Sequence, residues 1–198
     1  MPGSIKIDDG AGRYTILTNG GSLGSDKTIT IPNTTGTMAL TSDISAGGLT
    51  VADHFDITST VSGTGLITNW ARPTGTLQGN LGSGMTVSSG IFTFPSTGYY
   101  YVVCNLSMNN ISGNDTYMTI PFYSTNDNFS SQDTLFNISL STASNTALRG
   151  TASVILDITD VSNQKVKLEV ATEVGTVTIS GSTSESRSNL QFFKLGDT

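Results

Sequence analysis

Residues able to do acid–base or nucleophilic chemistry are few in this sequence. Its 198 residues include one histidine, His54, one cysteine, Cys104, and fifteen Asp and Glu side chains. A Ser-His-Asp or Cys-His arrangement would have to use His54, which lies between Asp53 and Asp56. We expect instead an exposed histidine at the entry of a strand, and a small buried hydrophobic residue at Cys104. The sequence therefore predicts no catalytic residue and no enzymatic activity.

Metal binding has one candidate segment. A zinc site needs three or four His, Cys or carboxylate ligands, which one His and one Cys do not supply. Calcium also accepts amide and carbonyl oxygens, and Asn126, Asp127, Asn128 and Asp133 lie in one polar segment. Their spacing does not match an EF-hand, so we expect a solvated loop and no cofactor, with calcium as the alternative.

The charge balance excludes two classes of partner. The net charge is −6, and the nine Lys and Arg residues are scattered, whereas nucleic-acid binding relies on clustered cations. No apolar run is long enough to span a membrane, and the N-terminus lacks the apolar region of an export signal. We expect no nucleic acid, no membrane insertion and a soluble chain made without a signal peptide.

The stretch that positions most of the remaining residues is Gly90–Met108. It joins a short apolar strand, a turn with Pro95 and Gly98, and a long alternating strand. Successive side chains of a strand point to opposite faces, so one face is a core face: Tyr100, Val102, Cys104, Leu106 and Met108. The other face carries Tyr99, Tyr101 and Val103, which we predict to form contacts between subunits.

Similar alternation recurs along the chain, and no segment shows helical periodicity. The sequence predicts an all-β protein with further strands at Phe55–Val61, Gly65–Ala71, Thr76–Leu81, Met85–Val87, Tyr117–Tyr123, Leu135–Leu140, Leu148–Ile158, Lys165–Val170, Val174–Ile179 and Asn189–Leu195. In Tyr117–Tyr123, the internal Pro121 indicates a sheet edge or a bulge.

The N-terminal part differs from the rest. Its short alternating pieces carry two or three apolar side chains each: Ser4–Ile7, Tyr14–Leu17, Lys27–Ile31 and Thr37–Leu40. Such small hairpins are marginal alone in water and would gain stability if three copies wound around one axis. With a hinge at Gly47-Gly48, we predict a β-rich shaft or attachment segment at 1–48 and a head domain at 49–198.

The pattern around Gly98 resembles a known family. Phe92, five residues, Gly98, one residue and Tyr100 are similar to the pattern of the heads of complement-type and tumour-necrosis-factor-like proteins, with Asn80 and Met85 at further positions. Leu190–Gly196 resembles the closing strand of that family. The chain departs from the pattern where aromatics are usual, at Thr74, Met85, Val102 and Cys104. The resemblance implies an antiparallel jelly-roll β-sandwich of about ten strands and a homotrimer.

A second resemblance concerns the N-terminal part. Thr28–Ile44, TITIPNTTGTMALTSDI, is similar to an element of bacteriophage tail fibres and other virion fibres, with a generic β-hairpin leader as the alternative. It implies location in a virion fibre, synthesis in the host cytoplasm, and contact of the N-terminal segment with other virion proteins.

Together these features predict a non-enzymatic homotrimeric fibre protein whose head binds a host surface receptor, which could be a glycan. The candidate recognition segments are the loops Asn109–Asp115 and Ser124–Asp133 and the turn Ala71–Thr76, with Asn126, Asn128 and Phe129 as candidate sugar ligands. The alternatives are a virion decoration or connector protein that drives trimerisation without receptor binding, and, as a third class, a depolymerase.

Overall fold

The computed structural model describes residues 4–8, 14–18, 48–75, 77–110, 116–142, 147–174 and 177–198. The chain divides into two compact units, Met1–Ser45 and Ala46–Thr198. In the first unit, β1 (Ser4–Asp8) and β2 (Tyr14–Thr18) pair antiparallel, as two of the four predicted pieces require. The other two pieces and the fibre-like segment Thr28–Ile44 lie outside the described residues.

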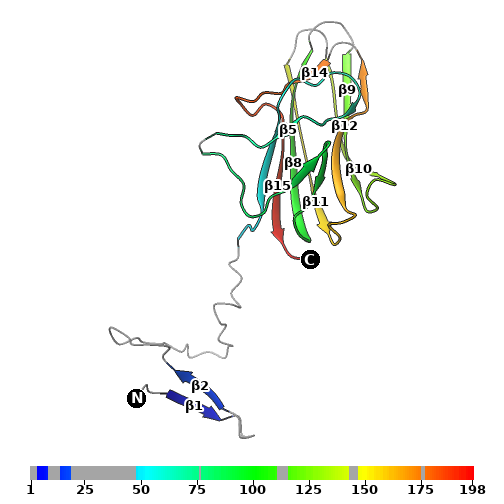
Figure 1. Ribbon diagram of the computed structural model, residues 1–198. Coiled ribbons are helices and arrows are strands. Elements are labelled where there is room, and N and C mark those ends of the chain that lie inside the picture. The colour runs from blue at the N-terminus through cyan, green and yellow to red at the C-terminus, as the bar shows by residue number, and fades with distance from the viewer. Residues whose placement is uncertain are drawn as a thin grey trace. The chain divides into compact units, whose positions relative to one another are not determined.

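The second unit contains the predicted head and is all β in its described part (Figure 1). Its strands are β3 (Ala52–Ile57), β4 (Gly65–Leu66), β5 (Trp70–Ala71), β6 (Thr86–Ser88), β7 (Ile91–Thr93), β8 (Gly98–Asn110), β9 (Thr116–Thr125), β10 (Asp133–Thr142), β11 (Ala147–Ile158), β12 (Lys165–Val170), β13 (Thr172–Val174), β14 (Val177–Ile179) and β15 (Asn189–Gly196). The described residues contain no helix that could cross a membrane.

These strands form two antiparallel sheets. One has the order β10-β9-β12-β7-β6, with β13 beside β9 and β4 beside β12. The other has the order β11-β8-β15-β3-β5, with β14 beside β8. The predicted antiparallel jelly-roll sandwich is therefore confirmed.

The core lies between the two sheets and is centred on aromatic side chains. The ring centroid of Phe92 is 5.2 Å from those of Phe55 and Phe192, and 5.5 Å from that of Trp70. The predicted core face of β8 is confirmed, because Tyr100, Val102, Cys104, Leu106 and Met108 are each at most 1% exposed. Full burial of such a side chain contributes about 1.5–3 kcal/mol.

β7 and β8 are consecutive but belong to different sheets. β7 pairs with β6 and β12, whereas β8 pairs with β11, β14 and β15. The predicted turn with Pro95 and Gly98 therefore does not close a hairpin. It carries the chain from one sheet to the other. The Tyr100 hydroxyl fixes this crossing by donating to the Ser96 carbonyl oxygen at 3.0 Å.

Other predicted strands differ at their boundaries. Gly65–Ala71 is divided into β4 and β5, which join different sheets. The strand predicted at Phe55–Val61 begins earlier and ends at Ile57. Within Thr76–Leu81, the described residues form no strand, although Leu81 makes an isolated bridge with Ala52. Turn composition alone does not reveal where a chain leaves one sheet for the other.

Pro121 lies inside β9, which has neighbours on both sides rather than an open edge. The pairing of β9 changes there: Phe122 faces Leu168 of β12, and Thr119 faces Thr172 of β13. This transition inserts one extra residue on the β12–β13 side. Of the two predicted settings, a bulge beside Pro121 is the one observed.

Candidate functional site

The side chains of β8 that point away from the core lie on an accessible sheet face. Tyr99 is 42% exposed, and Tyr101 and Val103 are half-buried. Ile155 of β11 stands opposite Tyr101 on one side, and Phe193 of β15 stands opposite it on the other. We call this set, with the 53%-exposed Leu195, the β8 outer face. The structure thus places the three predicted interface residues together and adds neighbours from two other strands.

Further along the same face the neighbours become polar. Thr151 donates to the Asn105 Oδ1 at 2.9 Å, and the Asn105 Nδ2 donates to the Asn189 Oδ1 at 3.0 Å. Gln191 donates to the same Asn189 oxygen at 3.3 Å. These bonds link β11, β8 and β15, so the face has an apolar end and a hydrogen-bonded polar end.

The polar end continues to the only histidine. Asn189 Nδ2 donates to the Ser186 Oγ at 2.9 Å, and Ser186 Oγ donates to the Asp56 Oδ1 at 2.6 Å. The His54 Nε2 lies 2.9 Å from that carboxylate oxygen and 3.2 Å from the Ser186 Oγ. His54 lies inside β3, and its side chain is 26% exposed, so the expected exposed position at the strand entry is wrong.

A serine, a histidine and an aspartate therefore meet, but not as a catalytic triad. In a triad the carboxylate holds one ring nitrogen while the serine hydroxyl contacts the other. Here Asp56 and Ser186 both contact Nε2. In addition, the hydroxyl proton of Ser186 is directed to Asp56. This arrangement links a loop to β3 and does not activate Ser186 as a nucleophile.

The turn after β5 is held by an ion pair between the buried Asp53 carboxylate and the partly exposed Arg72 guanidinium. The Arg72 Nε and Nη2 donate to the two oxygens of Asp53 at 2.8 and 2.7 Å, and Nη2 also donates to the Met85 carbonyl oxygen. The hydrogen bond to Asp53 raises the pKa of Arg72. Pro73, Thr74 and Gly75 then line a polar hollow of about 250 Å³ with Glu185 and neighbouring residues of its loop. Part of the predicted recognition turn thus borders a hollow, whereas Thr76 lies outside the described residues.

The loop between β9 and β10 contains the candidate sugar ligands. Asn128 and Phe129 have positive φ angles of 58° and 65°, a conformation that Asn tolerates and that costs a residue such as Phe about 1–2 kcal/mol. The Phe129 amide donates to the Thr125 Oγ1 at 2.9 Å, and the Asn128 amide donates to the Asn163 carbonyl oxygen at 3.0 Å. These bonds hold the strained backbone in place.

Two of the three candidate residues lie beside lysines of β12, and the third lines a hollow that Lys165 also lines. Phe129 lies beside Lys167 of β12, whose Nζ is 4.8 Å from the ring centroid, and the Asn128 Oδ1 accepts a hydrogen bond from Lys165. Asn126 instead lines a hollow of about 140 Å³ with Asp133 and other residues. Sequence reasoning missed both lysines as site residues. The alternation of Lys165–Val170 places them outward, but only the fold shows that β12 borders this loop.

The carboxylate of Asp127 is used within its own loop. Its Oδ1 accepts from the Ser131 amide at 2.9 Å and from the Thr125 hydroxyl at 2.7 Å, and its Oδ2 accepts from the Ser131 hydroxyl at 2.6 Å. These hydrogen bonds, led by the Ser131 side chain, lower the pKa of Asp127 to about 2. Bonds to this carboxylate compete with the predicted calcium alternative. The described part of the chain has no group of three His, Cys, Asp or Glu residues placed to hold a metal.

Cys104 is fully buried on the core face of β8, as predicted. Burial raises the pKa of its thiol, because the low-polarity interior disfavours the thiolate. Asn109–Asp115, the remaining predicted recognition loop, is described only as far as Asn110, which is still part of β8.

Comparison with known proteins identifies the fold. No family model and no curated protein matches the sequence. The structure of Eiger TNF from S. frugiperda is similar with a TM-score of 0.54 and 16% identity, covering 74% of this chain and 93% of that one. A crystal structure of murine APRIL at pH 5.0 is similar with a TM-score of 0.53 and 15% identity, covering 73% of this chain and 98% of that one. The head therefore has a tumour-necrosis-factor-like jelly-roll fold.

Proposed function

We propose that this chain is a non-enzymatic homotrimeric fibre protein of a bacteriophage, whose head binds a receptor on the host surface. In this proposal the N-terminal segment attaches the protein to other virion proteins. The tumour-necrosis-factor-like fold of the head supports a trimer and receptor binding in general. The fibre-like sequence at Thr28–Ile44 supports the virion setting.

The observation that carries the trimer is the β8 outer face. Ile155 is 60% exposed, and it stands in one cross-strand row with Tyr101 and Phe193. Contiguous apolar side chains on a sheet face typically mark an interaction surface in a soluble protein. Three copies related by a closed rotation bury such a face without leaving a free end for further assembly.

Trimerisation also explains how a shallow surface can bind cells. Each head has hollows of about 250 and 140 Å³ among its described residues, smaller than a typical small-molecule cleft. Three weak sites on one axis raise the effective affinity for a multivalent surface without any new contact. The site on each head then needs to recognise only a small chemical group.

The test of the trimer compares two tyrosines. Tyr99 on the β8 outer face is 42% exposed, and Tyr117 on β9 of the other sheet is 41% exposed. Mass measurement in solution should give three chains of 20.7 kDa per particle for the native protein and for Tyr117→Glu. The Tyr99→Glu variant should dissociate, because three carboxylates would be buried at the interface. A native monomer at micromolar concentration would contradict the proposal.

Receptor binding is tested separately on host cells. The native trimer should bind cells, and a dissociated Tyr99→Glu head should bind far less, because avidity is lost. A trimer that binds no host cell would instead support the decoration or connector alternative. Release of new reducing ends from host polysaccharide would contradict the non-enzymatic assignment.

A further inference from the structure

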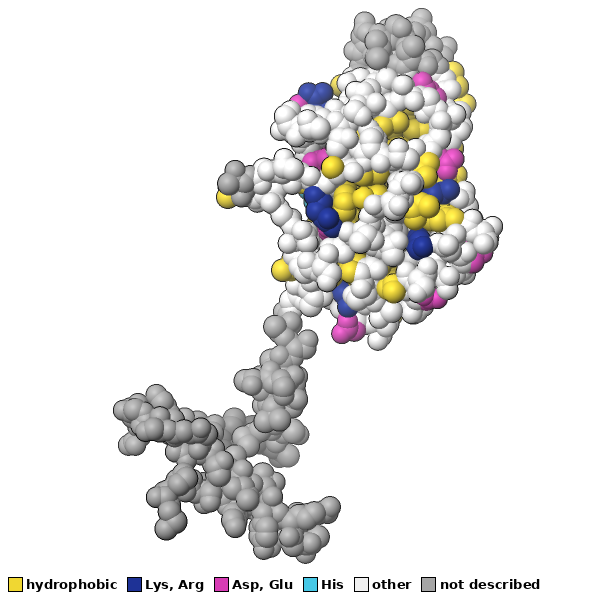
Figure 2. Space-filling view, viewed as in Figure 1, with side chains coloured by type: hydrophobic (Ala, Val, Ile, Leu, Met, Phe, Trp, Pro, Cys, Tyr) yellow, Lys and Arg dark blue, Asp and Glu magenta, His cyan; other side chains and the backbone are white. Residues whose placement is uncertain are grey.

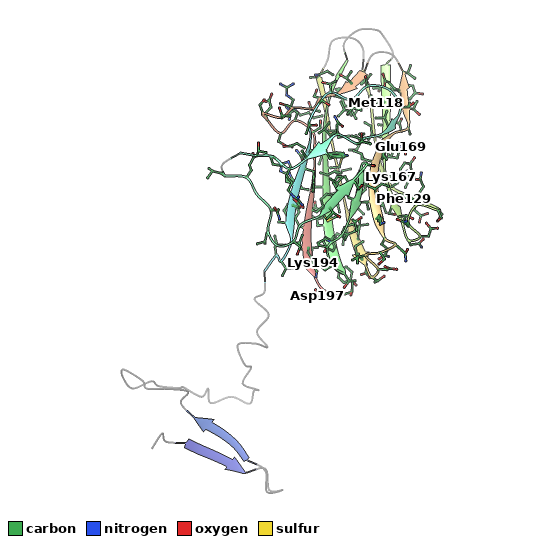
Figure 3. The ribbon with its side chains drawn as sticks, viewed as in Figure 1. Met118, Phe129, Lys167, Glu169, Lys194 and Asp197 are labelled. Carbon is green, nitrogen blue, oxygen red and sulfur yellow. The ribbon has the colours of Figure 1, made fainter. Side chains whose placement is uncertain are left out.

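A cation and two aromatic rings meet on the sheet that faces away from the proposed trimer contact. Lys167 of β12 places its Nζ 4.8 Å from the ring centroid of Phe129 and 5.4 Å from that of Tyr123. Phe129 comes from the loop after β9, and Tyr123 from β9 itself. Figure 3 shows Phe129, Lys167 and Glu169 on the same side of the head. Three segments therefore converge on one lysine.

The backbone that carries the Phe129 ring is held by hydrogen bonds. Asn128 and Phe129 both have positive φ angles, and such strain in non-glycine residues concentrates at binding sites. The Phe129 amide is held by Thr125, and the Asn128 side chain is held by Lys165. A loop backbone and a side-chain amide that are already hydrogen-bonded lose less freedom when a ligand arrives.

Lysine and carboxylate side chains lie close together in and around this cluster. The carboxylate of Glu169 lies 3.4 Å from the Lys167 Nζ, which is longer than a good charge-assisted hydrogen bond. Lys165 stands two residues earlier on the same face of β12 and donates to a neutral amide. Lys165 and Lys167 thus share this face of β12 with Glu169, while Asp133 and Asp157 line the hollow beside Lys165. Figure 2 shows Lys and Arg side chains beside exposed hydrophobic patches on one face of the head.

We infer that these residues bind one acidic sugar of a surface glycan, and we call them the Lys167 cluster: Tyr123, Asn128, Phe129, Lys165, Lys167 and Glu169. The aromatic surface suits the apolar C–H face of a pyranose, and the Lys167 ammonium suits its carboxylate. Asn128 and Glu169 supply an amide and a carboxylate for hydroxyl groups. The inference rests on the proposed host recognition, because it names the chemistry of the receptor.

A single carboxylate fits this cluster better than a polyanion does. Glu169 belongs to the cluster, and Asp127 precedes Asn128 in the same loop. Together with the net charge of −6, these carboxylates repel a chain of closely spaced anions. Nucleic acids also need more clustered cations than two lysines provide. The structure therefore favours a uronic-type sugar within a glycan of low charge density.

The test uses two sugars that differ only at C6. Methyl β-D-glucuronide carries a carboxylate where methyl β-D-glucoside carries a hydroxymethyl group. In an NMR titration of the full chain, the glucuronide should shift the amide signals of residues 125–131 and bind about fivefold to tenfold more tightly than the glucoside. Phe129→Ala should abolish binding of both sugars, and Lys167→Gln should reduce the glucuronide to the affinity of the glucoside.

The matched control is Arg187→Gln, which removes one positive charge from an exposed side chain in a different loop and should leave the preference unchanged. Equal affinity for the two sugars, a preference that survives Lys167→Gln, or tighter binding of an oligonucleotide at these residues would overturn the inference. The mass and cell-binding measurements on the same samples test the proposed function independently. If the Lys167→Gln trimer binds cells as well as the native trimer does, only the acidic-sugar assignment is overturned.

Discussion

At the scale of single residues, Asp53 is the most heavily bonded carboxylate among the described residues. Besides the two bonds from Arg72, it accepts from the Met85 amide at 2.6 Å and from the His54 amide at 2.9 Å. These bonds tie β3 to the segment between β5 and β6. Asp53 therefore joins β3 to this segment through hydrogen bonds rather than apolar contacts.

Asp53→Ala should lower the free energy of unfolding by about 3 kcal/mol, because it leaves buried donors without an acceptor. This value is the lower end of the usual range for removing one partner of a buried ion pair. Arg72 is 39% exposed, so water can solvate its guanidinium once Asp53 is gone. Urea denaturation measures the change. The control is Glu185→Ala, which breaks the exposed pair with Arg187 and should cost less than about 1 kcal/mol. Equal losses of unfolding free energy in the two variants would contradict this role of Asp53.

Asp127 gives a prediction about pH. Its folded-state pKa of about 2 lies below the ordinary value of about 3.9. Because the folded-state pKa is lowered, ionised Asp127 stabilises the folded protein at pH values above the unfolded-state pKa. This contribution is lost as the pH falls from about 4 through 2. A carboxyl NMR titration should show the low pKa in the native protein and a rise toward 3.9 in Ser131→Ala. An unchanged pKa in that variant would contradict the assigned cause.

At the scale of elements, the crossing between the two sheets requires glycine at position 98. Its φ is 140°, and a Cβ atom there would lie 2.4 Å from the Gly196 carbonyl oxygen and 2.4 Å from the Lys194 Cε. Lys194 is itself buried, with its Nζ bonded to Ser96 and Asp197. The start of β8 and the end of β15 are therefore packed backbone against backbone.

Gly98→Ala should destabilise the protein by at least about 1–2 kcal/mol, because alanine is strained at this φ and collides with the end of β15. Gly196→Ala is the matched control on the facing strand, since a Cβ there meets nothing within 4 Å. Thermal unfolding of both variants measures the difference. A Gly98→Ala protein as stable as Gly196→Ala would show that the crossing tolerates a side chain.

At the scale of the whole molecule, the two units have separate tasks in the proposed function. All residues of the β8 outer face belong to the unit Ala46–Thr198. A protein shortened to 46–198 should therefore keep a mass of three chains, because the proposed interface is intact. Sedimentation of the shortened and full-length proteins at equal concentration tests this. A shortened monomer beside a full-length trimer would show that the N-terminal segment drives assembly.

The sequence by itself determined the strand faces, because side-chain alternation is a local property. Lys165–Val170 forms β12 with the predicted bounds, and Val166, Leu168 and Val170 point inward as expected. The same alternation identified Tyr99, Tyr101 and Val103 as one outward set, whose role in a trimer stays a prediction. Phe129 was singled out from its loop composition alone.

Only the tertiary structure decided which segments become neighbours, because those contacts join residues far apart in the chain. It placed β7 and β8 in different sheets, brought Ser186 and Asp56 to the same nitrogen of His54, and set Lys167 beside Phe129. None of these pairings leaves a periodic signal in the sequence. The Lys167 cluster therefore depends on the pairing of β12 with β9.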